Sequence, residues 1–122
     1  MAKKSEIKFV VSLDEEKNPV GLEWTASDAP FEGLRQCDAL LLSFWDPEER
    51  TTMGIDLWTP KMLVHHMNVH YFQTLMKLAD TYGTATQNQE MAEFIRQFAH
   101  EFARRAKLPG LEATGAEGET PS

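Results

Sequence analysis

Cysteine is nearly absent from this sequence, which has only Cys37 among its 122 residues. A single cysteine cannot form an intramolecular disulfide, and the N-terminal residues MAKKSEIKF contain no apolar run of the kind found in secretory signals. Nor does any stretch approach the roughly 20 consecutive apolar residues of a membrane-spanning helix. The sequence therefore predicts a cytoplasmic protein that does not insert into membranes.

Basic residues are also scarce. The 12 Lys and Arg residues are outnumbered by 19 Asp and Glu residues, which gives a formal net charge of -7. Because binding to a nucleic-acid backbone needs clustered cations, we expect no nucleic-acid partner. The small basic group of Arg104, Arg105 and Lys107 lies near the end of a predicted helix, where cations complement the helix dipole.

Motifs of catalytic sites are missing too, since there is no Gly-rich phosphate loop and no Ser nucleophile motif. His66 and His70, four residues apart on a predicted helix, are weak candidates for a metal site. Met67 stands where a zinc protease would have its Glu, and no third ligand follows at the expected distance. The lone Cys37 before an apolar strand is typical of a core residue rather than a nucleophile. We expect no enzyme, no metal and no cofactor.

Four segments show the two-residue periodicity of β-strands, namely residues 7–13, 20–26, 38–45 and 51–58. The turn-forming cluster DPEER at residues 46–50 joins the last two, so a central hairpin is predicted there. The third strand is apolar on both faces and is therefore expected to be covered on both sides. Its side chains are Leu40, Leu42 and Phe44 on one face and Ala39, Leu41 and Trp45 on the other.

After residue 58 the apolar period changes to the 3.6 residues of an amphipathic α-helix. Thr59 and Pro60 are suited to begin a first helix, and Gly83 to end it. Thr86 or Asn88 can cap a second helix, which the residues Leu108-Pro109-Gly110 end. The predicted buried stripes are Val64, Met67, Tyr71, Leu75, Leu78 and Tyr82 in the first helix, and Met91, Ile95, Phe98, Phe102 and Ala106 in the second.

Strands followed by helices point to an α+β fold. We predict a four-stranded antiparallel sheet followed by two long helices packed on one of its faces, in the order β-β-β-β-α-α. Residues 1–107 are expected to form this single domain. Residues 108–122 are acidic and nearly free of apolar side chains, so a disordered tail is expected there.

The tryptophans indicate where the protein makes contacts. Trp45 and Trp58 would form an exposed apolar patch if they lie on the sheet face away from the helices. Packing inside the monomer, self-association and binding of another protein are all open for such a patch. The charge of Asp56 inside a strand is explained either by function or by protection of a sheet edge from aggregation. The predicted interface residues are Trp24, Leu41, Trp45, Asp56 and Trp58.

Several stretches resemble the gliding-motility-associated protein GldC family. They are KKSEIKF at residues 3–9, EWTASDAP at 23–30, LSFWDPEERTTMGIDLWT at 42–59, FQTLMKLADTYGTAT at 72–86 and EMAEFI at 90–95. The resemblance is specific, because a WDPEE turn followed by an IDLWT strand is not a generic pattern. It implies an accessory component of gliding motility and supplies no catalytic residue.

The order of four antiparallel strands and two helices in a small acidic protein is also similar to that of the export chaperone SecB. Two hypotheses for function follow. The first is a non-enzymatic accessory protein of gliding motility or its secretion machinery, acting through protein-protein contacts, as a homo-oligomer with an unidentified partner. The alternative is a SecB-like chaperone that holds unfolded export clients.

Overall fold

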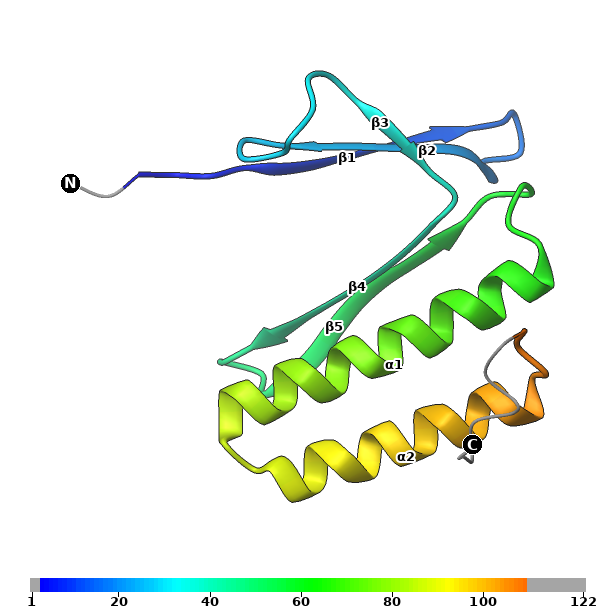
Figure 1. The fold of residues 1–122 in the computed structure, drawn as a ribbon. Coiled ribbons are helices and arrows are strands. Elements are labelled where there is room, and N and C mark those ends of the chain that lie inside the picture. The colour runs from blue at the N-terminus through cyan, green and yellow to red at the C-terminus, as the bar shows by residue number, and fades with distance from the viewer. Residues whose placement is uncertain (1–2, 110–122) are drawn as a thin grey trace. The chain divides into compact units, whose positions relative to one another are not determined.

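The chain folds into five strands followed by two helices in residues 3–109, the part that this computed structural model describes (Figure 1). The strands are β1 (Ile7–Leu13), β2 (Pro19–Ala26), β3 (Arg35–Cys37), β4 (Ala39–Asp46) and β5 (Thr51–Trp58), and the helices are α1 (Val64–Thr86) and α2 (Gln89–Arg105). Contacts within the chain divide it after Met62 into a strand unit and a helical unit. The predicted α+β class, with two helices after the strands, is confirmed.

In the first sheet, β2 lies between β1 and β3 and pairs antiparallel with both. The register of β1 and β2 places Phe9 opposite Trp24 and Val11 opposite Leu22. Leu22 is only 1% exposed and is the buried apolar side chain around which this sheet packs. The predicted first hairpin is therefore confirmed, with its apolar residues on one face.

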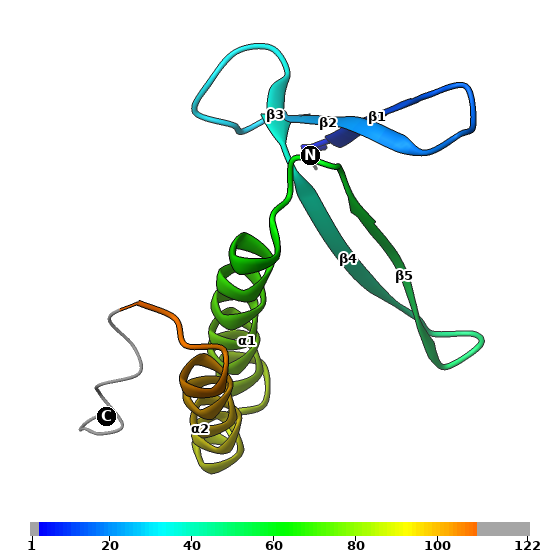
Figure 2. The ribbon, with the colours of Figure 1, turned by 90° about the vertical axis from the view of Figure 1, so that its right-hand side faces the viewer.

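The prediction of one four-stranded sheet is wrong. β4 and β5 form a separate two-stranded sheet, and the short strand β3, which was not predicted, pairs with β2 instead (Figure 2). The chain passes from β3 to β4 through Asp38, whose carbonyl accepts the N–H of Thr59 at 3.0 Å. Because β2 begins at Pro19, which has no N–H to donate, a strand continuing from β3 would soon run out of partners along β2. All eight residues of β4 pair with β5 instead.

The hairpin of β4 and β5 forms where the sequence predicts it. The carboxylate of Asp46 accepts the N–H groups of Glu48 at 2.9 Å and Glu49 at 3.3 Å. The carbonyl of Asp46 accepts the N–H of Arg50 at 2.8 Å, and Arg50 adopts a left-handed φ of 54°. Local bonds of this kind are the reason that Asp favours turns. The side chain of Asp46 is thus engaged in holding the turn.

The first helix begins and ends later than predicted. Thr59 does not cap it, because its side-chain oxygen accepts the N–H of Lys61 at 3.3 Å in a turn that precedes the helix. Leu63 is the N-cap and forms no side-chain capping bond. The helix continues past Gly83, whose carbonyl accepts the N–H of Gln87 at 2.9 Å. Gln87 then ends the helix in a left-handed conformation, a common way to stop a helix.

The two helices form an antiparallel hairpin that packs through small residues (Figure 1). A Cβ atom added at Gly83 would lie 3.2 Å from the Cβ of Ala92, which is closer than ordinary van der Waals contact. Side chains this small let two helix axes approach closely. The buried residues of the pair are Ala79 and Gly83 in α1 and Ala92, Ala99 and Ala103 in α2.

The ends of α2 follow the sequence closely. Asn88 caps its beginning, as predicted, since its side chain accepts the N–H of Met91 at 3.0 Å. At its end the N–H of Leu108 returns to the carbonyl of Ala103 at 3.0 Å, and Leu108 is buried. The helical unit therefore includes Leu108, which was assigned to the disordered tail. The rest of that prediction, from residue 110 onward, lies outside the described residues.

The predicted buried stripes of the helices are wrong in several members. Val64, Tyr71 and Leu78 of α1 and Met91 and Phe98 of α2 are exposed. The physical reason is that the helices meet along the row of small residues that lies beside each stripe. The large apolar side chains are consequently left on the outside of the hairpin.

Glu101 accepts hydrogen bonds from Arg104 and Arg105 in the last turns of α2. These bonds, first that from Arg104, lower the pKa of Glu101 from 4.5 to about 2. A carboxylate with a lowered pKa stabilises the fold at neutral pH, and this contribution is lost as the pH falls through the two pKa values.

We therefore expect Glu101→Gln to unfold at a slightly lower temperature than the wild type at neutral pH. The effect is small because the pair is exposed. The difference in Tm should shrink as the pH falls from about 4.5 toward about 2, the pKa range of this group. Thermal unfolding followed by circular dichroism measures it. A difference that stays constant over this range would show that the ion pairs add nothing to stability.

Candidate interaction surface

The register of β4 and β5 sorts their side chains onto two faces, because directly paired residues of antiparallel strands share a face. One face, called here the tryptophan face, pairs Ala39 with Trp58, Leu41 with Asp56, Ser43 with Gly54 and Trp45 with Thr52. The other, called the aliphatic face, pairs Leu40 with Leu57, Leu42 with Ile55 and Phe44 with Met53. The two faces agree with the alternation predicted from the sequence.

The tryptophan face carries its two indoles at opposite ends. Trp45 is 61% exposed and Trp58 is 58% exposed. Their levels in the register are six residues apart, which corresponds to roughly 20 Å along a strand. Between them lies the pair of Leu41 and Asp56, so a carboxylate occupies the middle of the face. Four of the five predicted interface residues, Leu41, Trp45, Asp56 and Trp58, thus lie on the same face of the hairpin.

A hollow of about 440 Å³ lies beside Trp58 within the strand unit. Asn18 of the turn between β1 and β2 and Pro19 at the start of β2 line one side of it, and Asp56, Trp58 and Pro60 line the other. An indole and two proline rings offer apolar contact, and Asp56 offers a negative charge. This combination suits an apolar or cationic side chain of another protein.

The aliphatic face is apolar along its whole length. Within the strand unit, Phe44, Met53 and Ile55 of this face are close to half exposed. A two-stranded sheet is at best marginally stable by itself. Apolar side chains on both faces of β4 and β5 therefore call for a packing partner.

Trp24, the fifth predicted interface residue, lies apart from the tryptophan face, in β2. Its ring meets the ring of Phe31 edge-on, with 5.1 Å between the centroids. The guanidinium of Arg35 lies 5.4 Å from the centroid of Phe31. Trp24 is half-buried by these contacts and holds the loop between β2 and β3 on the sheet.

The polar candidates do not converge on one site. His66 is exposed, with its ring 4.2 Å from that of His65, whereas Nε2 of His70 is buried without a hydrogen-bond partner in the described residues. Within residues 3–109, no three or more His, Cys, Asp or Glu side chains are grouped so as to hold a metal ion. Burial, and after it the neighbouring carboxylate of Asp38, raises the pKa of the Cys37 thiol. A raised pKa disfavours the thiolate that a nucleophile needs.

The sequence predicts only part of what the structure shows for the aliphatic face of β4 and β5 and for the aromatic residues of α2. The alternation of β4 and β5 predicts which residues share a face, but it does not predict that the strand unit itself leaves Phe44, Met53 and Ile55 close to half exposed. The exposed Phe94 and Phe98 of α2 belong to a stripe whose spacing is the same whether a helix packs inside its own chain or against another protein.

The fold and its surfaces define a class, which is a small α+β protein with a helical hairpin and an aromatic strand hairpin. No helix in the described part of the chain has the length and apolar character needed to cross a bilayer. A family model described as gliding motility-associated protein GldC-like matches residues 19–108, from β2 to the end of the helical unit. The chain belongs to this GldC-like family, as its resemblance predicts. No curated protein and no solved structure matches it.

Proposed function

We propose that this GldC-like protein is a non-enzymatic accessory component of gliding motility or its secretion machinery, which acts in the cytoplasm by binding proteins through its tryptophan face. The observation that carries the proposal is the exposure of Trp45 and Trp58 on one face of the same hairpin. Both self-association and a partner from the machinery would use this face.

Tryptophan is well suited to such a contact. Trp is enriched among the few interface residues that supply most of the binding energy. The two indoles are held by strands rather than by loops, so little conformational freedom is lost when a partner covers them. The raised pKa of Cys37 and the engagement of Asp46 in its turn also favour a binding role over a catalytic one.

The double substitution of Trp45→Ala and Trp58→Ala is expected to abolish partner binding and leave the fold intact, because both side chains are exposed. Truncation of one hot-spot tryptophan costs about 2 kcal/mol or more, which is roughly 30-fold in affinity. In a gliding strain that lacks the gene, the wild-type protein should restore colony spreading and the double variant should not, at equal protein levels.

Two sets of control variants make this experiment specific. Ser43→Ala with Thr52→Ala changes the same face without touching an indole, and Cys37→Ala, His66→Ala and His70→Ala remove the candidates for chemistry. All of these should restore spreading. Full spreading by the tryptophan variant, or its loss in the cysteine or histidine variants, would contradict the proposal.

The SecB-like alternative gains no support from the fold. Its likeness rested on a single four-stranded sheet, whereas the strands in the described part of the chain form a three-stranded and a two-stranded sheet. The exposed aliphatic face could hold an unfolded client, but nothing distinguishes it from an ordinary protein interface.

A further inference from the structure

The carboxylate of Asp56 has no hydrogen-bond partner among the described residues, unlike that of every other aspartate in the chain. The others accept backbone N–H groups in turns or side-chain donors, and they are Asp14, Asp28, Asp38, Asp46 and Asp80. None of the ion pairs in the described part of the chain includes Asp56 either. Aspartate is poorly suited to the inside of a strand, and a residue that breaks such a local rule without a local gain points to a function.

Asp56 lines the hollow beside Trp58, and all the residues around this hollow belong to the strand unit. The two side chains leave the same face of β5, because they are two residues apart. That spacing separates their Cα atoms by about 7 Å along the strand. Ala39, which is paired with Trp58, is too small to cover the indole ring. One ligand group can therefore touch the ring and the carboxylate at once.

Both walls of the hollow are held by hydrogen bonds inside the strand unit. On one side, the carboxylate of Asp14 accepts the N–H of Asn18 at 2.9 Å, and the carbonyl of Asn18 accepts the N–H of Asp14 at 3.0 Å. On the other side, the N–H of Thr59 donates to the carbonyl of Asp38 at 3.0 Å, and Pro60 follows with its fixed φ. Walls that are already ordered lower the entropic cost of binding.

We infer that this hollow binds an arginine side chain of the partner protein, with its guanidinium stacked on Trp58 and hydrogen-bonded to Asp56. The inference rests on the proposed function, which supplies the partner. A guanidinium is planar, donates two parallel hydrogen bonds to a carboxylate and stacks on an indole through its delocalised charge. The volume of about 440 Å³ lies within the roughly 300 to 1,000 Å³ of ligand sites, so the residues that flank the arginine also have room.

The arginines of this chain are engaged elsewhere, so they do not compete for the hollow. Those of the helical unit are ion-paired with acidic residues of that unit, and they are Arg96, Arg104 and Arg105. Arg35 lies over the ring of Phe31, and Arg50 lies in the turn of the hairpin, roughly 20 Å along β5 from Asp56. The same arginines are engaged in a second copy, which favours a partner of different sequence. The net charge of -7 also attracts a basic segment.

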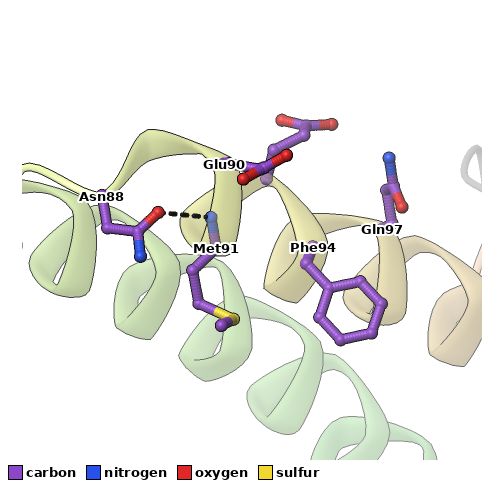
Figure 3. Close-up of a pocket in the computed structure, with 6 residues that line it drawn as sticks. Asn88, Glu90, Met91, Phe94 and Gln97 are labelled. Carbon is purple, nitrogen blue, oxygen red and sulfur yellow. Dashed lines mark hydrogen bonds between the residues drawn. The ribbon is translucent and has the colours of Figure 1, made fainter.

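A hollow on α2 shows by contrast what the site beside Trp58 has in addition. It lies near Glu90 and Phe94, so it also combines a carboxylate with an aromatic ring (Figure 3). Its lining residues all come from α2 and the N-cap Asn88, whose side chain already accepts the N–H of Met91. The hollow beside Trp58 lies between two segments of the strand unit instead, and Trp binds cations better than Phe does.

Binding of a short peptide to the full-length protein tests the inference. The probe is acetyl-Ala-Arg-Ala-amide, and its control replaces arginine by citrulline, an uncharged side chain of the same shape. NMR of the indole N–H groups should show a saturable shift of the Trp58 signal, which Trp58→Ala identifies by removing it. The citrulline peptide should bind at least about tenfold more weakly, because it lacks the charge-assisted bond. The signal of Trp45, equally exposed but paired with Thr52, is the internal control and should not move.

Two variants separate the role of Asp56 from the effect of net charge. Asp56→Asn keeps the shape of the side chain and should weaken binding of the arginine peptide at least about tenfold. Glu48→Gln removes an equal charge from an exposed position in the turn of the same hairpin and should change the affinity by less than about twofold. Circular dichroism checks that both variants keep their fold.

Colony spreading tests whether the partner uses this site. Asp56→Arg should abolish spreading at equal protein levels, because it places a cation where the arginine of the partner binds. Glu48→Arg makes the same exchange in the turn and should leave spreading intact.

The inference is overturned if the arginine and citrulline peptides bind equally, if Asp56→Asn binds as well as the wild type, or if Asp56→Arg spreads normally. The absence of any shift at Trp58 would also overturn it, and Asp56 would then serve to protect the strand edge from aggregation. Each of these results leaves the proposed function standing, because that function is tested separately by the Trp45→Ala, Trp58→Ala variant.

Discussion

Replacing Ala99 by leucine is expected to destabilise the helical hairpin by about 3 kcal/mol. Ala99 is fully buried where α1 and α2 meet, and the added atoms have no space unless the helices separate. The tightness of this contact is evident at Gly83, where even one methyl group would lie 3.0 Å from the side chain of Gln89. Separating the helices would cost the contacts of their other small residues as well.

Urea unfolding followed by far-ultraviolet circular dichroism measures this change in the free energy of unfolding. Gln97→Leu is the matched control, because it introduces the same side chain two residues away at an exposed position. The control should change stability by less than about 0.5 kcal/mol. Equal stabilities of the two variants would mean that the helices do not pack through their small residues.

Ala99 and Phe98 show why the sequence pattern misplaces the helical core. A hydrophobic stripe identifies the side chains that avoid water, and by that measure Phe98 ranks above its neighbour. The structure reverses the order, with Ala99 buried and Phe98 exposed. Small residues let helices pack closely, but alanine is also a common surface residue of helices because of its propensity, so its spacing alone is not a signal of burial.

The strands were more predictable than the sheets. Period-two alternation and the DPEER turn locate β4 and β5, and the register confirms which residues share the tryptophan face. Alternation does not predict which strands pair, however, and it therefore does not predict the separation into a three-stranded and a two-stranded sheet.

The second large effect is expected for Gly54→Val in β5. Valine favours strands and glycine weakens them, so propensity alone predicts a gain in stability. The structure predicts the opposite, because a Cβ atom at Gly54 would lie 2.9 Å from the backbone oxygen of Leu42. Neither backbone can move without breaking the pairing of Ser43 with Gly54. We expect a loss of about 2 to 3 kcal/mol, in the range of mutations that strain the backbone.

Amide hydrogen exchange measures the loss of stability in Gly54→Val separately for each strand. Amides of β4 and β5 should lose protection in Gly54→Val, whereas those of β1 and β2, which pair in the other sheet, should keep theirs. Thr52→Val is the matched control, since it places valine at an exposed site on the same face and should be neutral or stabilising. Because the hairpin positions Trp45 and Trp58, Gly54→Val should also abolish colony spreading, with both indoles still present in the chain. Unchanged protection in β4 would show that the strands accommodate a side chain at residue 54, and glycine there would then have no structural role.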